Sequence, residues 1–358
     1  ALSLVTFGVV GVAVVVVDGV VIDPNDNAVV ATDDAVVTAA EDAIVAGSVL
    51  DNDSAPDGID TVELVAGPNQ GDLTLNGDGT FTFDPGNAFD HLAAGETATE
   101  TFTYRVTDAD GDSDVGTVTI TITGTNDGPV AAADVVANGT EDTAMVISAG
   151  DLLGNDTDAD ASDVLSIGAV GSPVGGTVAL NGQGDVVFTP DADYSGPASF
   201  TYTVVDGNGG QSTATATFDI DAVADTPDLT VADVTGQAGQ PVALDIDAAL
   251  TDLDGSEVLS VTISGLPAGS LLSAGTANGD GSFTVAAGDL AGLTVTPPAG
   301  AQGDISVDVT ATATEQSNGA SATTAAAFVL TLPLANQAPT DIALDGSSVT
   351  ENEQGWVV

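Results

Sequence analysis

Short patterns recur along this chain at intervals close to 100 residues. The dipeptide Asn25-Asp26 lies 101 residues before Asn126-Asp127, and Phe102-Thr103-Tyr104 returns 98 residues later as Phe200-Thr201-Tyr202. Whole β-sandwich domains have a period of this length, whereas solenoid repeats recur every 20 to 50 residues, roughly. The recurrence therefore predicts a tandem string of similar domains.

The repeated segments carry the alternation of β-strands. Apolar and polar residues alternate over 102–106 and again over 118–122, on either side of an acidic turn. Asn-Gly-x-Gly sequences separate other alternating runs at 76–79, 181–184 and 278–281, and Asn and Gly accept the positive φ values that tight hairpins need. Because no long amphipathic helix competes with these strands, the sequence predicts an all-β fold.

The charge balance restricts what can hold the fold together. The chain has 54 acidic residues, one basic residue (Arg105), no Cys and a formal net charge of −53. Carboxylate repulsion opposes the compact state unless cations bind or salt screens it. Nucleic acids and anionic membranes are excluded as partners because both bind basic patches. Disulfides and Lys–Asn isopeptide crosslinks are excluded too, which leaves metal ions, and Ca²⁺ prefers oxygen ligands.

The longest apolar run is at the N-terminus, residues 1–22. It lacks the basic region of a signal peptide, so we interpret the chain as a processed protein or an excised fragment. A transmembrane helix is the alternative, but the run to Val17 is short, Asp18 interrupts it, and its Val and Gly content favours strands. We expect β-strands and no membrane insertion.

The linker patterns define the expected domain boundaries. We expect three β-sandwiches at residues 28–128, 129–226 and 227–335. Residues 1–27 would supply the closing strands of an upstream module or a donor strand, and residues 336–358 the opening strand of a further module.

Three segments resemble a known family. The linker Asp23-Pro24-Asn25-Asp26-Asn27-Ala28 resembles the inter-repeat calcium motif of cadherins, D-x-N-D-N-A-P, with Val29 in place of the final proline. Residues 101–129 and 141–210 resemble the VCBS-type and cadherin-like tandem repeats of large bacterial surface adhesins and repeats-in-toxin proteins. The third repeat departs from this pattern, because Glu315-Gln316-Ser317-Asn318-Gly319 replaces the acidic turn, which weakens the case for calcium there.

This resemblance implies a tandem string of Ig-like or cadherin-like β-sandwich domains, with Ca²⁺ stiffening the linkers, outside a bacterial cell. The implied function is non-catalytic: an extension segment of a bacterial surface adhesin. The alternative is a self-assembling subunit of an extracellular filament or surface layer, joined head to tail by strand complementation. The expected partners are adjacent repeats of the same chain or of identical chains.

The expected calcium ligands are the acidic and amide side chains of the linkers, the Glu-Asp pairs, the Asn-Asp turns and the acidic hairpin turn. They are Asp23, Asn25, Asp26, Asn27, Glu41, Asp42, Asp51, Asp53, Asp108, Asp110, Asp112, Asn126, Asp127, Glu141, Asp142, Asp156, Asp158, Asp160, Asp252 and Asp254. The first full linker would hold one ion between Asn126, Asp127, Glu41, Asp42, Asp158 and Asp160.

The acidic turn from Asp108 to Asp114 has two interpretations, a metal site and a solvated hairpin. Its D-x-D-x-D spacing begins like an EF-hand loop, but Thr119 stands where an EF-hand needs its bidentate Glu, so a true EF-hand is excluded. Adaptation to high salt is a further explanation of the acidity as a whole; stability in KCl with chelator present would support it.

Catalysis is not expected. His91 is the only histidine, so a Ser-His-Asp triad or a histidine zinc site would have to centre on it, and it lies in a connection between strands. Sugar-binding platforms are sparse as well, because Trp356 is the only tryptophan.

Overall fold

The computed structural model describes residues 3–4, 15–17, 20–22 and 27–333. Over these residues the fold is all-β, as the alternation predicted, and the helical elements are α1 (Ala149–Leu153), η1 (Gly86–Ala88) and η2 (Ala287–Asp289). The chain forms two compact units. The first comprises Ala1–Gly139, Ala144–Thr189 and Pro197–Asp219, and the second comprises Thr140–Thr143, Pro190–Gly196 and Ile220–Val358.

Three short strands precede the first sandwich: β1 (Ser3–Leu4), β2 (Val15–Val17) and β3 (Val20–Ile22). They pair antiparallel in the order β1-β2-β3. The apolar N-terminal run thus contains strands, in line with its Val content. Strand complementation between this run and residues 336–358 stays a prediction, because the latter lie outside the described residues.

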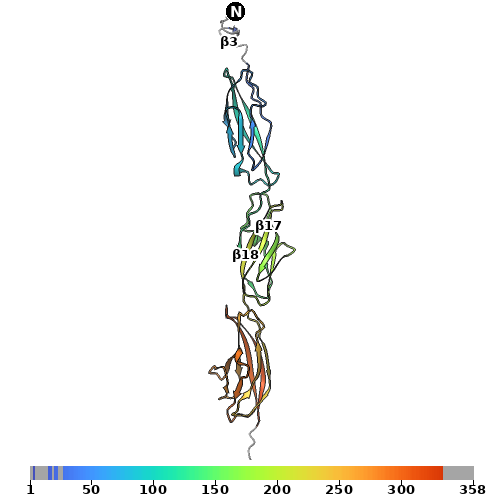
Figure 1. The fold of residues 1–358 in the computed structure, drawn as a ribbon, viewed down its shortest axis with the longest axis vertical. Helices are drawn as coiled ribbons and strands as arrows, with labels where there is room; N and C mark the ends of the chain where they lie inside the picture. The colour runs from blue at the N-terminus through green and yellow to red at the C-terminus, as the bar shows by residue number, and fades with distance from the viewer. Residues whose placement is uncertain (1–2, 5–14, 18–19, 23–26, 334–358) are drawn as a thin grey trace, which may run out of the picture. The chain divides into compact units, whose positions relative to one another are not determined.

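The first β-sandwich combines a four-stranded and a three-stranded sheet, drawn in blue to green in Figure 1. The four-stranded sheet has the order β4 (Val37–Ala40), β10 (Ser113–Thr123), β9 (Thr97–Asp108), β6 (Ile59–Ala66), and β4 runs parallel to β10. The three-stranded sheet has the order β5 (Val45–Ser48), β8 (Thr80–Asp84), β7 (Asp72–Leu75).

Alternate side chains of the β9–β10 hairpin fill the core of this sandwich. Phe102, Tyr104 and Val106 of β9 are at most 1% exposed. Phe81 of β8 packs edge-on against Phe102, with ring centroids 5.2 Å apart. The strand period of two therefore buries one face of the hairpin and leaves the other to solvent.

Arg105, the single basic residue, lies in the middle of β9 on the outward face. Its register neighbours are Val115 on β10 and Glu63 on β6. Strand β9 is thus hydrogen-bonded along both edges, and the backbone at Arg105 lies inside a sheet.

The second β-sandwich repeats this plan, and Figure 1 shows its long strands β17 and β18 side by side. Its larger sheet has the order β11 (Asp134–Val135), β18 (Gln211–Asp221), β17 (Gly196–Val205), β14 (Ser166–Val174), with β12 (Gly139–Thr140) also on β18. Its smaller sheet has the order β13 (Met145–Ile147), β16 (Val186–Pro190), β15 (Gly176–Leu180). Phe188 and Phe218 pack edge-to-face in the core, 4.9 Å between centroids.

The third β-sandwich contains three sheets. The largest has the order β20 (Val234–Thr235), β29 (Ser321–Leu332), β28 (Gly303–Glu315), β23 (Glu257–Ser264), β26 (Phe283–Ala286), β25 (Thr276–Ala277). The others are β21 (Val242–Ala243), β27 (Thr294–Thr296), β24 (Leu271–Leu272) and the pair β19 (Asp228–Ala232), β22 (Asp245–Ala249). Its core, within residues 242–332, is a separate cluster from that of residues 29–122. The predicted domain boundaries stay predictions.

The Asn-Gly-x-Gly sequences form hairpin turns. In the first, the Asn76 N–H donates to the Thr80 carbonyl at 2.8 Å. The last glycine of each sequence has a positive φ: 84° at Gly79, 88° at Gly184 and 94° at Gly281. Only a residue without a Cβ adopts such angles without strain, so the glycines fix the turns.

Candidate metal centres

Carboxylates gather in four groups among the described residues, and in each group one oxygen from each of three side chains lies within 4.8 Å of the others. We name them the hairpin cluster (Asp57, Asp108, Asp110), the linker cluster (Asp158, Asp163, Asp206), the glutamate cluster (Glu141, Asp252, Glu315) and the loop cluster (Asp142, Asp193, Asp225). Like charges at this separation repel unless protons or cations intervene.

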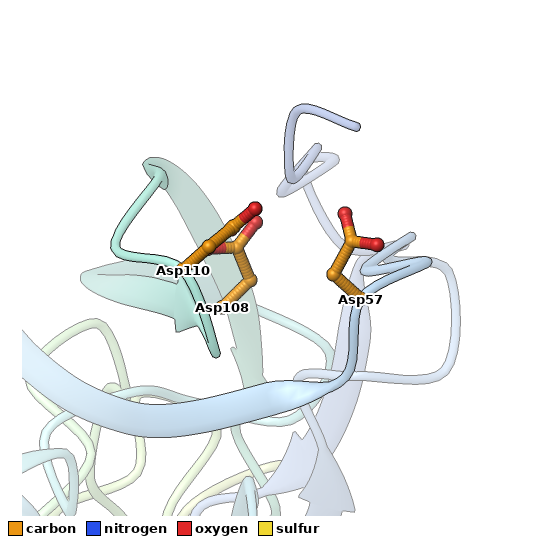
Figure 2. A group of neighbouring side chains, drawn as sticks. All are labelled: Asp57, Asp108 and Asp110. Carbon is orange, nitrogen blue, oxygen red and sulfur yellow. The ribbon is translucent and has the colours of Figure 1, made fainter. Parts of the chain in front are cut away.

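The hairpin cluster lies where β9 turns into β10. Figure 2 shows the carboxylates of Asp108 and Asp110 facing that of Asp57, which belongs to the loop before β6. Asp108 is 1% exposed, and its Oδ1 accepts the N–H groups of Gly111 at 3.0 Å and Asp112 at 2.8 Å. Its Oδ2 is buried and accepts no hydrogen bond from any described residue. One oxygen thus positions the turn, and the other points into the cluster.

The linker after β10 is anchored to acidic side chains through its backbone. The Thr125 N–H donates to Glu41 Oε1 at 2.6 Å, and the Asp127 N–H donates to Asp160 Oδ2 at 2.9 Å. Between them, the Asn126 amide donates to Asp206 Oδ2 of the linker cluster at 3.0 Å. The linker therefore brings together carboxylates from segments far apart in the sequence.

Four side chains at the linker each have one buried oxygen that is not hydrogen-bonded within residues 27–333. These oxygens are Glu41 Oε2, Asn126 Oδ1, Asp158 Oδ2 and Asp160 Oδ1. Buried polar oxygens normally have a partner, and an orphaned group indicates an absent water or ion. The linker thus presents several oxygen ligands with free lone pairs.

Burial and the negative charges gathered around the linker raise the pKa of one of its carboxyl groups. Burial raises the pKa of the Asp127 carboxyl above its usual range. Neighbouring negative charges raise it further and belong, from largest to smallest effect, to Glu41, Asp42, Asp90 and Asp158. These charges favour binding of a cation at Asp127.

The glutamate cluster is the most deeply buried of the four. Glu141, Asp252 and Glu315 are 4%, 2% and 1% exposed. The Ser256 hydroxyl lies 2.9 Å from Asp252 Oδ2 and 3.0 Å from Glu315 Oε1, and the Val223 N–H donates to Glu141 Oε1. Over the described chain, Oε2 of Glu141 and of Glu315 are both buried without a donor. Three carboxylates thus share few donors from the described residues in a buried site.

Burial and crowding alter the acidity of this cluster. Burial raises the pKa of Glu141 to about 7, and the charges of Glu315, Asp252 and Asp142 add to the effect against the opposing Val223 N–H. The pKa of Glu315 is raised for the same main reason, its burial. Without a cation, the cluster therefore holds protons that ordinary carboxyls would have lost.

The loop cluster contains two residues in the left-handed region, Asp142 with φ 56° and Asp193 with φ 57°. The Asp193 N–H donates to Asp142 Oδ1 at 3.2 Å, and the Asp225 N–H donates to Glu257 Oε1 at 2.8 Å. Such angles in non-glycine residues cost about 1 kcal/mol or more and occur preferentially at functional sites.

The donor set fits a hard cation. The candidate ligands are carboxylate and amide oxygens, and the chain has no Cys and a single His, so the usual zinc ligands are missing. Calcium accepts six to eight oxygens at about 2.3–2.6 Å, which suits clusters of this density. The orphaned buried oxygens are the observation that a bound cation would explain.

Most of the predicted ligands lie in or beside these clusters: Glu41, Asp42, Asp108, Asp110, Asn126, Asp127, Glu141, Asp142, Asp158, Asp160 and Asp252. Asn27 lies at the hairpin cluster through its N–H, which donates to Asp57 Oδ2 at 3.0 Å. Asp23, Asn25 and Asp26 lie outside the described residues.

Five predicted ligands are placed differently. Asp112 supplies the hairpin turn through its N–H, and Asp254 accepts the N–H of Ser256 at 2.6 Å. Asp51 is exposed, and Asp53 and Asp156 lie beside buried tyrosines. In none of the five does the side chain belong to one of the four clusters, as far as the structure is described.

Several cluster residues were missed by the sequence reading: Asp57, Asp163, Asp193, Asp206, Asp225 and Glu315. Three cluster residues share one position in their sandwiches, at the end of a long strand or directly after it. Asp108 ends β9, Glu315 ends β28, and Asp206 directly follows β17. The turn containing Glu315 was interpreted as the loss of an acidic site, whereas the structure places Glu315 in the most buried cluster.

None of the helices that the structure describes is long and apolar enough to cross a membrane. No curated protein sequence matches the chain. Matches to known families come instead from domain models and solved structures.

Two family models match the chain in succession. The model of the bacterial cadherin-like domain matches residues 25–124, and that of the cadherin-like domain matches residues 125–221. Together they account for more than half of the 358 residues.

Solved structures of cadherins share the fold. Mouse Cadherin-23 EC22-24 is 16% identical, with 86% of this chain and 99% of that chain covered and a TM-score of 0.50. Human CDH23 EC21-23 is 14% identical, with 83% and 97% covered and a TM-score of 0.50. With its tandem β-sandwiches and two consecutive domain matches, the chain belongs to the cadherin-like family, of which residues 25–221 form two domains.

Proposed function

We propose that this chain is a calcium-stabilised segment of a bacterial surface adhesin, whose work is extension and stiffness. The observation that carries the proposal is the set of buried carboxylate and amide oxygens that lack donors among the described residues and gather at the ends of the sandwiches. Cadherin-like domains are generally structural or adhesive modules outside the cell, which agrees with this role.

The linker after β10 is where calcium would act on stiffness. Free linkers between sandwiches swivel, because contacts between neighbouring domains are small and polar. An ion held by Asn126 and Asp127 together with Glu41, Asp158 and Asp160 would fix the linker to strands on both sides of it. The ion would coordinate the oxygens that lack hydrogen-bond donors, and its positive charge would offset the negative charge of the carboxylates.

The glutamate and loop clusters would form a second calcium centre in the second unit. Glu141 and Asp142 are adjacent in sequence, and the pKa of Asp225 is raised by burial and by the charges of Asp142, Asp193 and Asp252. The two clusters are therefore electrostatically connected. We infer that the third sandwich binds calcium through Asp252 and Glu315, although its turn lacks the Asp-rich sequence.

Calorimetric titration with Ca²⁺ after chelator treatment tests the proposal. We expect heat of binding, and a melting temperature that rises on calcium addition, because a ligand that binds only the folded state stabilises it. Glu41→Gln and Glu141→Gln should each weaken calcium affinity by about tenfold or more, since each removes one charge from a buried ligand.

Asp72→Asn is the matched control, since Asp72 is exposed on β7 and lies in none of the described clusters. It removes one negative charge from the same sandwich as Glu41 without removing a ligand. The proposal is refuted if Glu41→Gln and Asp72→Asn bind calcium with equal affinity. It is also refuted if neither chelator nor calcium changes the melting temperature.

The expected partners are neighbouring repeats of the same chain or of identical chains, and the expected setting is the bacterial cell surface. Head-to-tail polymerisation stays a prediction, which negative-stain microscopy with and without calcium addresses directly. Filaments that form in calcium would support the assembly alternative, and isolated particles under the same conditions would contradict it.

A further inference from the structure

Asparagine followed directly by glycine occurs six times in this chain, and such a pair can react within itself. The pairs begin at Asn76, Asn138, Asn181, Asn208, Asn278 and Asn318. The backbone nitrogen of the glycine can attack the side-chain amide carbon of the asparagine, because glycine has no Cβ to hinder the approach. The attack needs a glycine N–H that no acceptor holds, an amide that can turn, and room for a cyclic imide.

The fold restrains three of the six pairs through the backbone of the glycine. The Gly209 N–H donates to Asp206 Oδ1 at 2.9 Å, and the Gly319 N–H donates to the Glu315 carbonyl oxygen at 2.9 Å. Gly139 is buried in β12, which pairs with β18. In these three pairs the attacking nitrogen is therefore held in place.

Two of the restrained pairs also have a fixed amide. The Asn208 amide donates to both carboxylate oxygens of Asp163, at 2.8 Å and 3.0 Å. The Asn318 amide donates to the Ala222 carbonyl oxygen at 2.8 Å. Turning either amide toward the following glycine would break hydrogen bonds, two of them to a charged acceptor.

The three pairs in the Asn-Gly-x-Gly hairpins leave the glycine nitrogen open. The N–H groups of Gly77, Gly182 and Gly279 donate to no acceptor within the described chain. All three glycines are exposed, and nothing lies within 4 Å of a Cβ placed on any of them. None of the three has a φ in the left-handed region. Each therefore has the space that ring closure and an entering water molecule need.

Two of these hairpins hold the asparagine amide at more than one point. Asn181 Oδ1 accepts the Asp185 N–H at 2.9 Å, and its amide nitrogen donates to Asp185 Oδ2 at 3.3 Å. The Asn278 amide donates to the hydroxyls of Ser282 at 2.9 Å and Thr284 at 3.0 Å. Both amides are thus fixed, although the glycine beside each is open.

Asn76 is held least. Its side chain is exposed, and among the described residues its amide makes a single hydrogen bond, to the Thr80 hydroxyl at 3.0 Å. Thr80 is exposed as well, and its hydroxyl donates to Asp78 Oδ1 at 2.6 Å. The pair Asn76-Gly77 therefore combines an open nitrogen, open space and the most weakly held amide of the six.

We propose that Asn76-Gly77 is a site of spontaneous deamidation in the folded protein. The Gly77 nitrogen loses its proton and forms a bond to Asn76 Cγ, the bond between Cγ and the amide nitrogen breaks, and ammonia leaves with the proton. Water then opens the cyclic imide. Opening at Cγ gives aspartate, and opening at the main-chain carbonyl gives isoaspartate, in which the chain runs through Cγ. No oxidant or reductant takes part.

The product alters the turn between β7 and β8. The hydrogen bonds with Thr80 hold the pKa of Asp78 below its usual range, so the new carboxylate forms beside an existing anion. Isoaspartate also adds a methylene group to the main chain at a residue whose N–H and carbonyl both close the turn, the first to Thr80 at 2.8 Å and the second from Gly79 at 3.0 Å. Deamidation should therefore loosen this hairpin.

Incubation of the folded full chain with calcium in mildly alkaline H₂¹⁸O tests the proposal. Digestion with an acid protease stops the reaction, and mass spectrometry follows each Asn-Gly peptide. We expect the Asn76 peptide to lose its amide and gain one ¹⁸O about tenfold faster than the Asn208 peptide, a difference in barrier of about 1.4 kcal/mol. Electron-transfer fragmentation should find both aspartate and isoaspartate. In denaturant the two rates should become similar, because the restraints on Asn208 are gone.

Gly77→Ala tests the role of the glycine nitrogen. Alanine fits at this position without strain, and its Cβ should slow deamidation of Asn76 about tenfold by hindering the attack. Gly182→Ala is the matched control, because it places the same methyl group in the corresponding hairpin of the second sandwich. It should leave the rate at Asn76 unchanged.

Three results would overturn the proposal. The first is an Asn76 peptide that keeps its amide as long as the Asn208 peptide does. The second is Gly77→Ala that deamidates at the wild-type rate, which would mean direct hydrolysis by water. The third is an equally large difference between the two peptides in denaturant, which would mean that the sequence sets the rates and the fold does not. The wild-type comparison needs no variant, and it holds whether or not the clusters bind calcium.

Discussion

The linker cluster and the glutamate cluster share one plan and differ in their donors. A backbone N–H just after a strand donates to the glutamate of a Glu-Asp pair at both sites: Thr125 to Glu41 beside the linker cluster, and Val223 to Glu141 in the glutamate cluster. The difference lies one residue further along the chain. There the first linker has Asn126, whose amide donates to Asp206, and the second has an alanine at position 224.

This difference predicts how much each cluster would gain from a bound cation. The Asn126 amide gives the linker cluster a donor of its own and lowers the pKa of Asp206, so this carboxylate is stable as an anion. In the glutamate cluster, Asp252 and Glu315 share the Ser256 hydroxyl, and the other donors among the described residues are the N–H groups of Val223 and Asp254. Burial raises the pKa of Glu141 and Glu315. We therefore expect the cluster with the weaker sequence motif to be the more dependent on calcium.

Calcium removal should have the largest effect and should separate the two clusters. We expect the chelator to lower the stability of both units, and that of the second more, because its buried carboxylates have fewer donors. At a free calcium concentration of about 100 times Kd, one site contributes about 2.7 kcal/mol to the free energy of unfolding. Hydrogen exchange of peptides from β28 and β9 measures the two regions separately. Equal loss of protection in the peptides from β28 and β9 would contradict the expected difference between the two units.

Glu315→Gln should act in opposite directions with and without calcium. With calcium, loss of a ligand charge should weaken binding about tenfold, or about 1.4 kcal/mol. With chelator, the same change removes a buried like charge and should raise the melting temperature of the second unit. Titration calorimetry and thermal melts measure the two signs. Asp245→Asn, at an exposed position on β22, is the control that should show neither effect.

The pH dependence of the chelated protein should reflect the glutamate cluster. Burial raises the pKa of Glu141 from the ordinary glutamate value of 4.5 to about 7, so between these values the folded state holds a proton that the unfolded chain has lost. The contribution of Glu141 to stability is present below about pH 4.5 and disappears as pH rises through about 7. Melting temperatures in chelator should therefore fall over this range, and Glu141→Gln should flatten the curve. An unchanged slope in the variant would assign the effect to other groups.

Exchange of the linker residue should have the smallest effect. Asn126→Ala removes one hydrogen bond whose loss water and calcium partly compensate, so we expect the free energy of unfolding to fall by about 0.5–1 kcal/mol. Ala224→Asn supplies an amide to the second unit and should raise its stability in chelator by less than about 1 kcal/mol. Denaturant unfolding of both variants tests whether this amide explains the difference between the clusters.

The fold follows from local patterns in the sequence. Alternation over 102–106 and 118–122 predicts the β9–β10 hairpin, and the Asn-Gly-x-Gly sequences predict turns where the structure has them. These features depend on periods and turn chemistry within a few residues of one another. Periodicity and turn chemistry over a few residues are therefore enough to predict the strands, the hairpin turns and the all-β fold class.

The clusters depend on distant residues, and there the sequence reading was incomplete. Asp57 meets Asp108 from 51 positions away, and Glu315 meets Glu141 from 174 positions away, so no local spacing reveals either contact. Asp53 belongs to an Asn-Asp turn that resembles a ligand motif. In the fold its carboxylate lies under Tyr104, because the bridge between Val30 and Ser54 fixes the neighbouring backbone beneath the ring.

The position of Arg105 has a consequence for proteolysis. Proteases of the trypsin type cut only after Lys or Arg, and this chain offers them a single bond, in the middle of β9. A protease must draw an extended segment into its active site, but this backbone is paired with β10 on one edge and β6 on the other. The folded chain therefore presents no accessible bond to this class of protease.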